Sequence, residues 1–96
     1  MPAYLIVRAQ VHDMAQYRQY MQKTPAILAT YGGEFLVRGG EKVVLEGADS
    51  GERIVLIRFP NAQAAQAMYN SPEYQAAIKL RDGAAEASFI VMEGIE

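Results

Sequence analysis

Three arginines on separate apolar segments have the clearest chemistry for binding in this chain. Arg8, Arg38 and Arg58 each interrupt an alternating apolar run, in LIVRAQV, EFLVRGG and RIVLIRFP. A guanidinium is a rigid fork of donors that matches a carboxylate, an enolate or a phosphate. If the segments are neighbouring strands, arginines on one face would form an anion site. The alternative is that they hold the strands in register by pairing with acidic residues, for which the candidates are Glu34, Glu46, Glu52 and Glu93.

Proton transfer needs a second kind of group, and His12 is the only histidine. Its unperturbed pKa lies close to neutrality, so it is the natural candidate for a catalytic general base. Its place between an apolar run and Asp13 equally fits a solvated loop residue. Tyrosine phenols are the other candidates, with core or rim packing as the alternative role. The tyrosines on or near expected helices are Tyr17, Tyr20, Tyr31, Tyr69 and Tyr74, of which Tyr31 joins the arginines as a candidate ligand-binding residue.

Several classes of chemistry have no support in the composition. The chain has no cysteine, which removes disulfides, thiolate nucleophiles and cysteine-bound metals. One histidine with scattered carboxylates gives no metal-ligand spacing, so we expect neither a metal nor a cofactor. No glycine-rich phosphate loop and no nucleophile elbow is present.

Charge and hydropathy limit the classes of molecule that this protein is expected to bind. With 9 basic and 11 acidic residues and no basic stripe, the chain is not expected to bind nucleic acid. It contains no apolar run of membrane-spanning length, and its first residues lack the pattern of a signal peptide. We therefore expect a cytoplasmic protein without a membrane partner.

The elements that must position these side chains follow from periodicity and capping. Alternation predicts strands at Ala3 to Val11, Glu34 to Arg38 and Arg53 to Phe59, and we expect two further strands at 42–46 and Ala87 to Glu93. Asp13, Asn61 and Ser71 are predicted to cap helices. Because an internal proline costs a helix about 3 kcal/mol, Thr24-Pro25 is expected to end one segment and start another. Tyr31 should close it, with Gly32 or Gly33 in the left-handed conformation, and Gly39-Gly40 is expected to form a bulge or tight turn.

The order of elements predicts the fold. Strand, helix, strand, strand, helix, strand in one domain over residues 1–96 is typical of the α+β ferredoxin-like βαββαβ fold, an antiparallel sheet with both helices on one face.

The second face of that sheet should then be apolar as well. The residues assigned to the helix side are Leu5, Val7, Phe35, Val37, Val55 and Ile57. The residues left outside are Tyr4, Ile6, Leu36, Ile54, Leu56 and either Ile90 or Phe89. An exposed apolar patch of that size indicates an interface. We therefore predict a homodimer in which two sheets pack face to face as a dimeric α+β barrel, with a cavity between sheet and helices or between the sheets.

A combination of motifs covers nearly the whole chain and resembles one family. These motifs are YGGEFLVRGG (31–40), LEG (45–47), RIVLIRFPN (53–61), MYNSPEYQAAIKLR (68–81) and MEG (92–94). The combination resembles the uncharacterised family named domain of unknown function 1330, which implies a dimeric α+β barrel of ferredoxin-like topology. That family has no agreed activity, so the resemblance assigns no role to any residue. The wider superfamily includes cofactor-independent monooxygenases and small isomerases, which are analogies of fold.

Two hypotheses of function follow. The first is a small enzyme, an isomerase or a cofactor-independent oxygenase-like protein, acting on a small anionic metabolite in the dimer cavity. Arg38, with Arg8 or Arg58, would bind the anion, and His12 or a tyrosine would move a proton. The second is a non-catalytic dimeric module that binds a small ligand or is associated with stress. An unpaired and reachable Arg38 would favour the enzyme, and a fully paired Arg38 in a filled barrel would favour the module.

Overall fold

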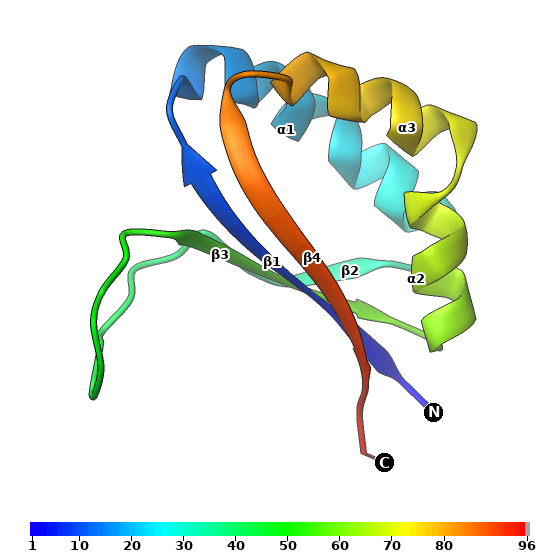
Figure 1. Cartoon of the computed structure of the whole chain (residues 1–96). Coiled ribbons are helices and arrows are strands. Elements are labelled where there is room, and N and C mark those ends of the chain that lie inside the picture. The colour runs from blue at the N-terminus through cyan, green and yellow to red at the C-terminus, as the bar shows by residue number, and fades with distance from the viewer. Residues whose placement is uncertain (96) are drawn as a thin grey trace.

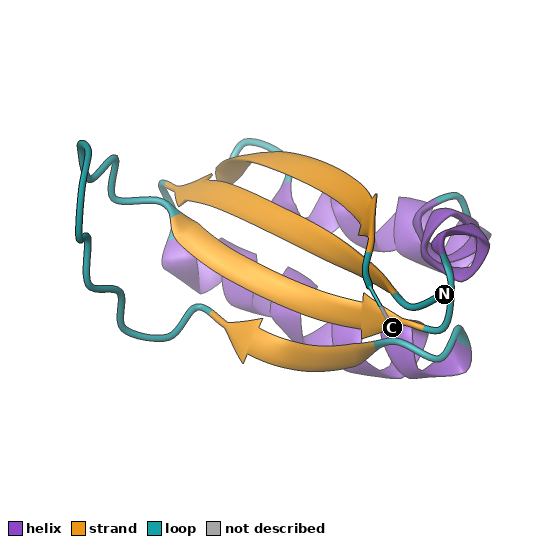
Figure 2. Cartoon of the chain, turned by 90° about the horizontal axis from the view of Figure 1, so that it is seen from below, coloured by secondary structure: helices purple, strands orange, loops and turns teal. Residues whose placement is uncertain are grey.

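An antiparallel sheet of strand order β2-β3-β1-β4 forms one layer, and the helices cover one of its faces (Figures 1 and 2). This is a computed structural model, which describes residues 1–95. The elements are β1 (Ala3–Val11), α1 (Met14–Thr30), β2 (Glu34–Arg38), β3 (Arg53–Phe59), α2 (Ala62–Tyr69), α3 (Pro72–Ile78), a short 3-10 helix η1 (Lys79–Arg81) and β4 (Ala85–Glu93). The predicted α+β ferredoxin-like fold is therefore confirmed, and β4 begins two residues earlier than expected.

The three predicted helix caps are confirmed. The side chain of Asp13 accepts a hydrogen bond from the backbone N–H of Gln16 at 3.1 Å, and Asn61 and Ser71 do the same at α2 and α3. Each cap satisfies a backbone donor that the first helical turn leaves free, so each helix begins where its cap stands. Across residues 1–95, none of the helices has the length and apolar character needed to span a membrane.

The expected break at Thr24-Pro25 is wrong, because α1 runs through Pro25 without interruption. A proline has no N–H, so Pro25 cannot donate to the carbonyl of Met21 four residues earlier. Two other donors take that role. The hydroxyl of Thr24 lies 3.3 Å from the Met21 oxygen, and Nη2 of Arg38 lies 2.7 Å from it. The Thr24 contact is local, whereas the shorter Arg38 contact is a tertiary hydrogen bond that replaces the one Pro25 cannot make.

A bulge in β2 changes which side chains reach the helices. Phe35 lies opposite Ile57, but Val37 lies opposite Leu56, so the register shifts at the residue between them. Beyond the shift, Arg38 lies opposite Val55, whose side chain is buried beneath the helices. The expectation that Val37 faces the helices is therefore wrong, and Val37 is 42% exposed. The bulge was expected at Gly39-Gly40, but it lies earlier in the chain, between Phe35 and Val37.

Residues 42–46 do not form the predicted strand. They belong to an irregular segment, residues 39–52, that we call the arm. The arm projects past the end of the sheet and away from the helices (Figure 1). Nζ of Lys42 bridges it internally, at 3.3 Å from Oδ1 of Asp49 and 2.6 Å from the carbonyl oxygen of Glu52. The apolar run of the arm has the composition of a strand, but it does not pair with a neighbouring strand.

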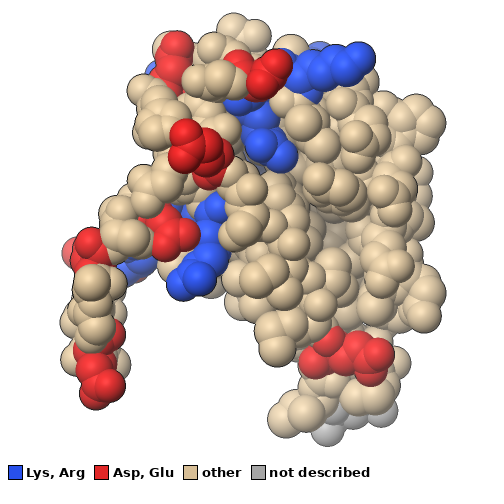
Figure 3. All heavy atoms as spheres, viewed as in Figure 1, with Lys and Arg blue, Asp and Glu red and all other residues tan. Residues whose placement is uncertain are grey.

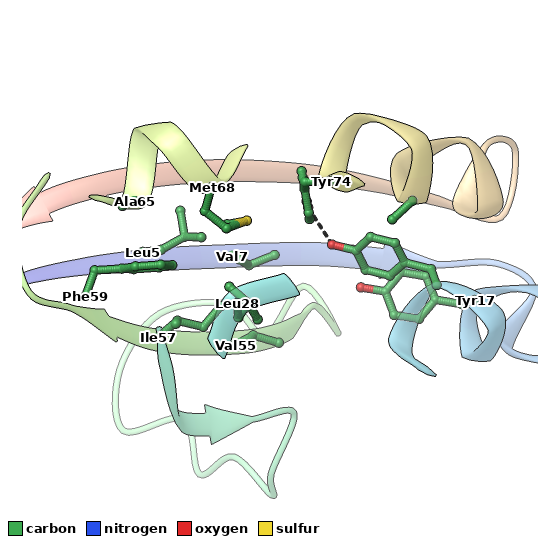
Figure 4. Packing of buried hydrophobic residues seen from close by; sticks show 12 residues of the cluster. Leu5, Val7, Tyr17, Leu28, Val55, Ile57, Phe59, Ala65, Met68 and Tyr74 are labelled. Carbon is green, nitrogen blue, oxygen red and sulfur yellow. Dashed lines mark hydrogen bonds between the residues drawn. The ribbon is translucent and has the colours of Figure 1, made fainter. Parts of the chain in front are cut away.

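The core lies between the helices and one face of the sheet (Figure 4). Leu5, Val7, Val55 and Ile57 point to the helices as predicted, and each is at most 7% exposed. Phe35 packs against their edge. The alternative left open in β4 resolves in favour of Ile90, which is 47% exposed on the outer face, whereas Phe89 packs against the core. We call the apolar face turned away from the helices the outer face.

Candidate functional site

The three sequence-predicted arginines do not share one face. Arg8 and Arg58 lie opposite Ile54 and Tyr4, which alternate with the buried positions, so both are on the outer face. The bulge places Arg38 on the helix side instead. The predicted cluster is therefore wrong for Arg38, since one inserted residue reverses the face of every residue after it. Of the acidic partners considered, Glu52 lies 3.7 Å from Nε of Arg8.

Arg38 instead reaches a narrow pocket between the sheet and α1, which we call the inner pocket. Its volume is about 30 Å³, and its apolar lining includes Leu28, Phe35 and Val55. The enclosed part of this pocket has room for about two water molecules. The pocket opens to solvent beside the exposed Arg38, so a larger ligand would enter it with its anionic end only. The guanidinium of Arg38 lies 4.5 Å from the centre of the Phe35 ring and donates to the Met21 carbonyl. Arg38 is thus held at the pocket by a cation–π contact and a helix carbonyl, with its remaining donors available.

A second arginine, Arg53, lines the same pocket. Its Nη2 donates to the Arg38 carbonyl oxygen at 3.3 Å, and its Nε is buried without a hydrogen-bond partner among residues 1–95. Gly39 permits this position. A Cβ atom there would collide with the Arg53 guanidinium, and Gly39 has φ +69°, where other residues are strained. The alternation of Arg53 with Val55 and Ile57 is the sequence signal that marks it as helix-facing.

The pocket also contains a pair of buried phenols. The Tyr20 and Tyr74 hydroxyl oxygens share a hydrogen bond and lie 2.5 Å apart. The dashed line at Tyr74 in Figure 4 marks this bond. Burial raises the pKa of both phenols above the ordinary value. The Arg81 guanidinium acts in the opposite direction on both groups, but burial outweighs it. The pair therefore stays neutral near pH 7 and can donate a hydrogen bond.

Arg81 is close to this pair. Its Cζ lies 5.2 Å from the centre of the Tyr20 ring and 5.3 Å from that of Phe89. Burial alone would lower the pKa of Arg81, but the two tyrosines outweigh burial and the net pKa is raised. Its Nε, like that of Arg53, is buried and has no hydrogen-bond partner in the described part of the chain. Arg81 is therefore a permanent cation with an unused donor, and no local sequence pattern marks it as a candidate site residue.

His12 and Tyr31 lie outside the inner pocket. The His12 side chain is 55% exposed, and its Nε2 lies 3.2 Å from Oε1 of Glu86. Tyr31 ends α1 as predicted and lines a separate surface hollow with Glu73. The structure therefore does not bring either residue together with Arg38. Within residues 1–95, no group of three or more histidine, cysteine, aspartate or glutamate side chains is placed to hold a metal ion.

The topology and the pocket under its helices define an α+β protein of the ferredoxin-like class. The chain belongs to the family described as "Domain of unknown function (DUF1330)", whose profile matches residues 2–95. No curated protein matches the sequence.

Solved structures of low sequence identity share this fold. A protein of unknown function from Rhodopseudomonas palustris has 18% identity and a TM-score of 0.79, covering 99% of this chain and 83% of its own. SnoaB from Streptomyces nogalater, a cofactor-independent oxygenase, has 12% identity and a TM-score of 0.70, with 99% and 94% coverage. A dimeric ferredoxin-like protein of unknown function from Jannaschia sp. has 14% identity and a TM-score of 0.65, with 98% and 100% coverage. At these identities the likeness shows the fold alone.

Proposed function

We propose that this protein is a homodimeric enzyme that binds a small organic anion in the inner pocket. The observation that carries the proposal is the pairing of two guanidiniums with an apolar pocket. Arg38 and Arg53 both line it, Nε of Arg53 is buried without a partner, and no carboxylate lies in the lining to neutralise them. Buried donors of this kind are satisfied by a ligand oxygen or by water.

The lining favours substrates that ionise readily. The pocket has two guanidiniums and neutral phenols, but no histidine, aspartate or glutamate among its lining residues. Two nearby cations lower the pKa of a bound enol or phenol, so an acidic substrate binds as its enolate without a protein base. The phenol pair then donates to an oxyanion. Such an enolate can isomerise or react directly with oxygen. The structural neighbour SnoaB is a cofactor-independent oxygenase, which supports the reaction with oxygen.

A non-catalytic binding module is the second candidate. It is favoured by the absence of a general base among the pocket-lining residues and by the small volume of about 30 Å³. The same guanidiniums would then hold an anion without converting it. His12, the predicted general base, would have no role in either case unless the ligand extended to the end of β1.

The outer face supports the homodimer. It carries apolar side chains that remain exposed, among them Leu36 at 46%, Ile90 at 47% and Met92 at 55%. The arm adds Leu45 at 94% and Val43 at 79%, and it extends on the side where a second sheet would pack (Figure 1). Contiguous apolar surface of this kind marks an interface. Structural neighbours described as dimeric support a second copy of this chain as the occupant.

Acetylacetone, a small acidic diketone, tests the anion site. We expect its enolate to bind the protein and the Arg53→Met variant to bind at least about tenfold more weakly, since a hydrogen bond to a charged group is lost. Arg18→Met is the matched control, because Arg18 is exposed on α1 and lines none of the described pockets. Equal binding by both variants, measured by calorimetry, would contradict the proposal. Faster deuterium exchange into the bound diketone than in buffer would separate the enzyme from the binding module.

A further inference from the structure

We propose that a groove beside Arg81 is a second ligand site, one that binds planar aromatic carboxylates. The groove lies between α2 and the edge strand β4, and its volume is about 340 Å³. That is more than ten times the volume of the inner pocket and falls within the range of small-molecule sites. This site goes beyond the proposed function, which concerns the inner pocket.

The walls of the groove suit a flat ring. Tyr69 of α2 and Phe89 of β4 pack against each other, with ring centres 5.6 Å apart, and together form one aromatic wall of the groove. Val91 and Ala87 extend the wall along β4. Aromatic and aliphatic side chains in such an arrangement contact a planar apolar body over a large area at little cost in rotamer freedom. The apolar part of the ligand is therefore a ring rather than a flexible chain.

The charge in the groove is a single cation. Arg81 lines it, and no aspartate or glutamate is among the lining residues. Nε of Arg81 is buried without a partner, and the groups that act on its guanidinium are the phenols of Tyr20 and Tyr74, not a carboxylate. A carboxylate on the ligand would supply that counter-charge and accept two parallel hydrogen bonds.

The groove and the inner pocket are separate compartments with a common wall. Leu5 and Phe89 line both of them, whereas Arg53 lines only the inner pocket and Arg81 only the groove. Phe89 also packs against Tyr74, with ring centres 6.2 Å apart, so it fills the space between the two compartments. The amides of Gln66 and Asn70 line the groove and can select a polar substituent on the ring.

The test uses 4-hydroxybenzoate and its neutral analogue 4-hydroxybenzamide on the full chain. We expect the carboxylate to bind at least about tenfold more tightly than the amide, with amide NMR shifts at Tyr69 and Val91. Arg81→Met should abolish that difference, Arg81→Lys should retain part of it, and the exposed control Arg18→Met should change nothing. Because Arg81→Met also removes a packed side chain, Ala87→Leu provides a second variant that fills the groove and leaves Arg81 intact. It should block both probes.

Three outcomes would overturn this site: equal affinity for the two probes, unchanged binding by Ala87→Leu, or NMR shifts confined to Leu28 and Phe35 of the inner pocket. The two proposals fail independently. Arg53→Met should lose acetylacetone and keep 4-hydroxybenzoate, and Arg81→Met should do the reverse.

Discussion

Nη2 of Arg38 lies 2.7 Å from the carbonyl oxygen of Met21, the oxygen that Pro25 leaves without its helical donor. A residue from the sheet thus completes the hydrogen bonding of α1 and is fixed at the inner pocket by the same contact. The helix and the candidate site are therefore coupled through one carbonyl group.

This coupling predicts a non-additive pair of substitutions. Pro25→Ala should raise the free energy of unfolding by about 1 to 3 kcal/mol, because the new N–H can donate to the Met21 oxygen. Arg38→Met should destabilise the original chain, and should cost less in the Pro25→Ala background, where a backbone N–H also donates to that oxygen. Urea denaturation of the four proteins measures the coupling, expected at about 0.5 kcal/mol or more. Strict additivity would show that the Arg38 contact does not compensate for the proline.

The buried tyrosine pair predicts a loss of stability in alkali. The pKa of Tyr20 and of Tyr74 is raised in the folded protein, so above the ordinary phenol pKa of about 10 the unfolded chain loses protons that the folded chain keeps. The free energy of unfolding is unaffected below that pH and should fall above it, by up to about 1.4 kcal/mol per pH unit for each tyrosine. Urea denaturation between pH 9 and pH 11 measures the slope. The Tyr20→Phe/Tyr74→Phe double variant is the control and should show a shallower one; an identical slope would refute the assignment.

The outer face predicts how the proposed dimer can be broken. Ile6→Asp or Leu56→Asp puts an unpaired carboxylate in the middle of that face and should yield a monomer in analytical ultracentrifugation, because a buried unpaired charge is costly. Gln19→Asp, exposed on α1, adds the same charge elsewhere and should leave the dimer intact. If the original chain sediments as a monomer, or the outer-face variants remain dimeric, this face is not the interface.

His12 provides a negative prediction. Since its ring is exposed beside Glu86 and lines none of the described pockets, His12→Gln should change acetylacetone affinity and deuterium exchange by less than about twofold. A loss of exchange at unchanged affinity would return His12 to the role of general base that its residue type suggests.

The arm is a charged segment that does not form the strand expected from its sequence. Acidic side chains follow the arm, and basic ones gather where it meets the body (Figure 3). The short apolar run within residues 42–46 has the composition of a strand, but a strand needs a neighbour to pair with its backbone. Polar contacts hold the arm instead: Lys42 contacts Asp49 and Glu52 within it, and Gln10 of β1 donates to the Ser50 carbonyl oxygen. A sequence pattern shows which residues are apolar, but it does not show whether a neighbouring strand is available for pairing.

The sequence alone determined what depends on near neighbours. Asp13, Asn61 and Ser71 cap helices because a side-chain oxygen reaches an N–H three residues away, and alternation placed Leu5 and Ile57 in the core. The order of elements was then sufficient for the ferredoxin-like fold.

Only the tertiary structure decided the candidate site. A bulge in β2, set by pairing with β3, turned Arg38 from the outer face to the helices. Distant contacts brought Arg53 to Arg38 and Arg81 to Tyr20, and a donor from β2 allowed α1 to continue through Pro25. These features depend on contacts between residues that are far apart in the chain. Local sequence patterns do not predict such contacts, because the free energy that stabilises them comes from the packing of the whole domain.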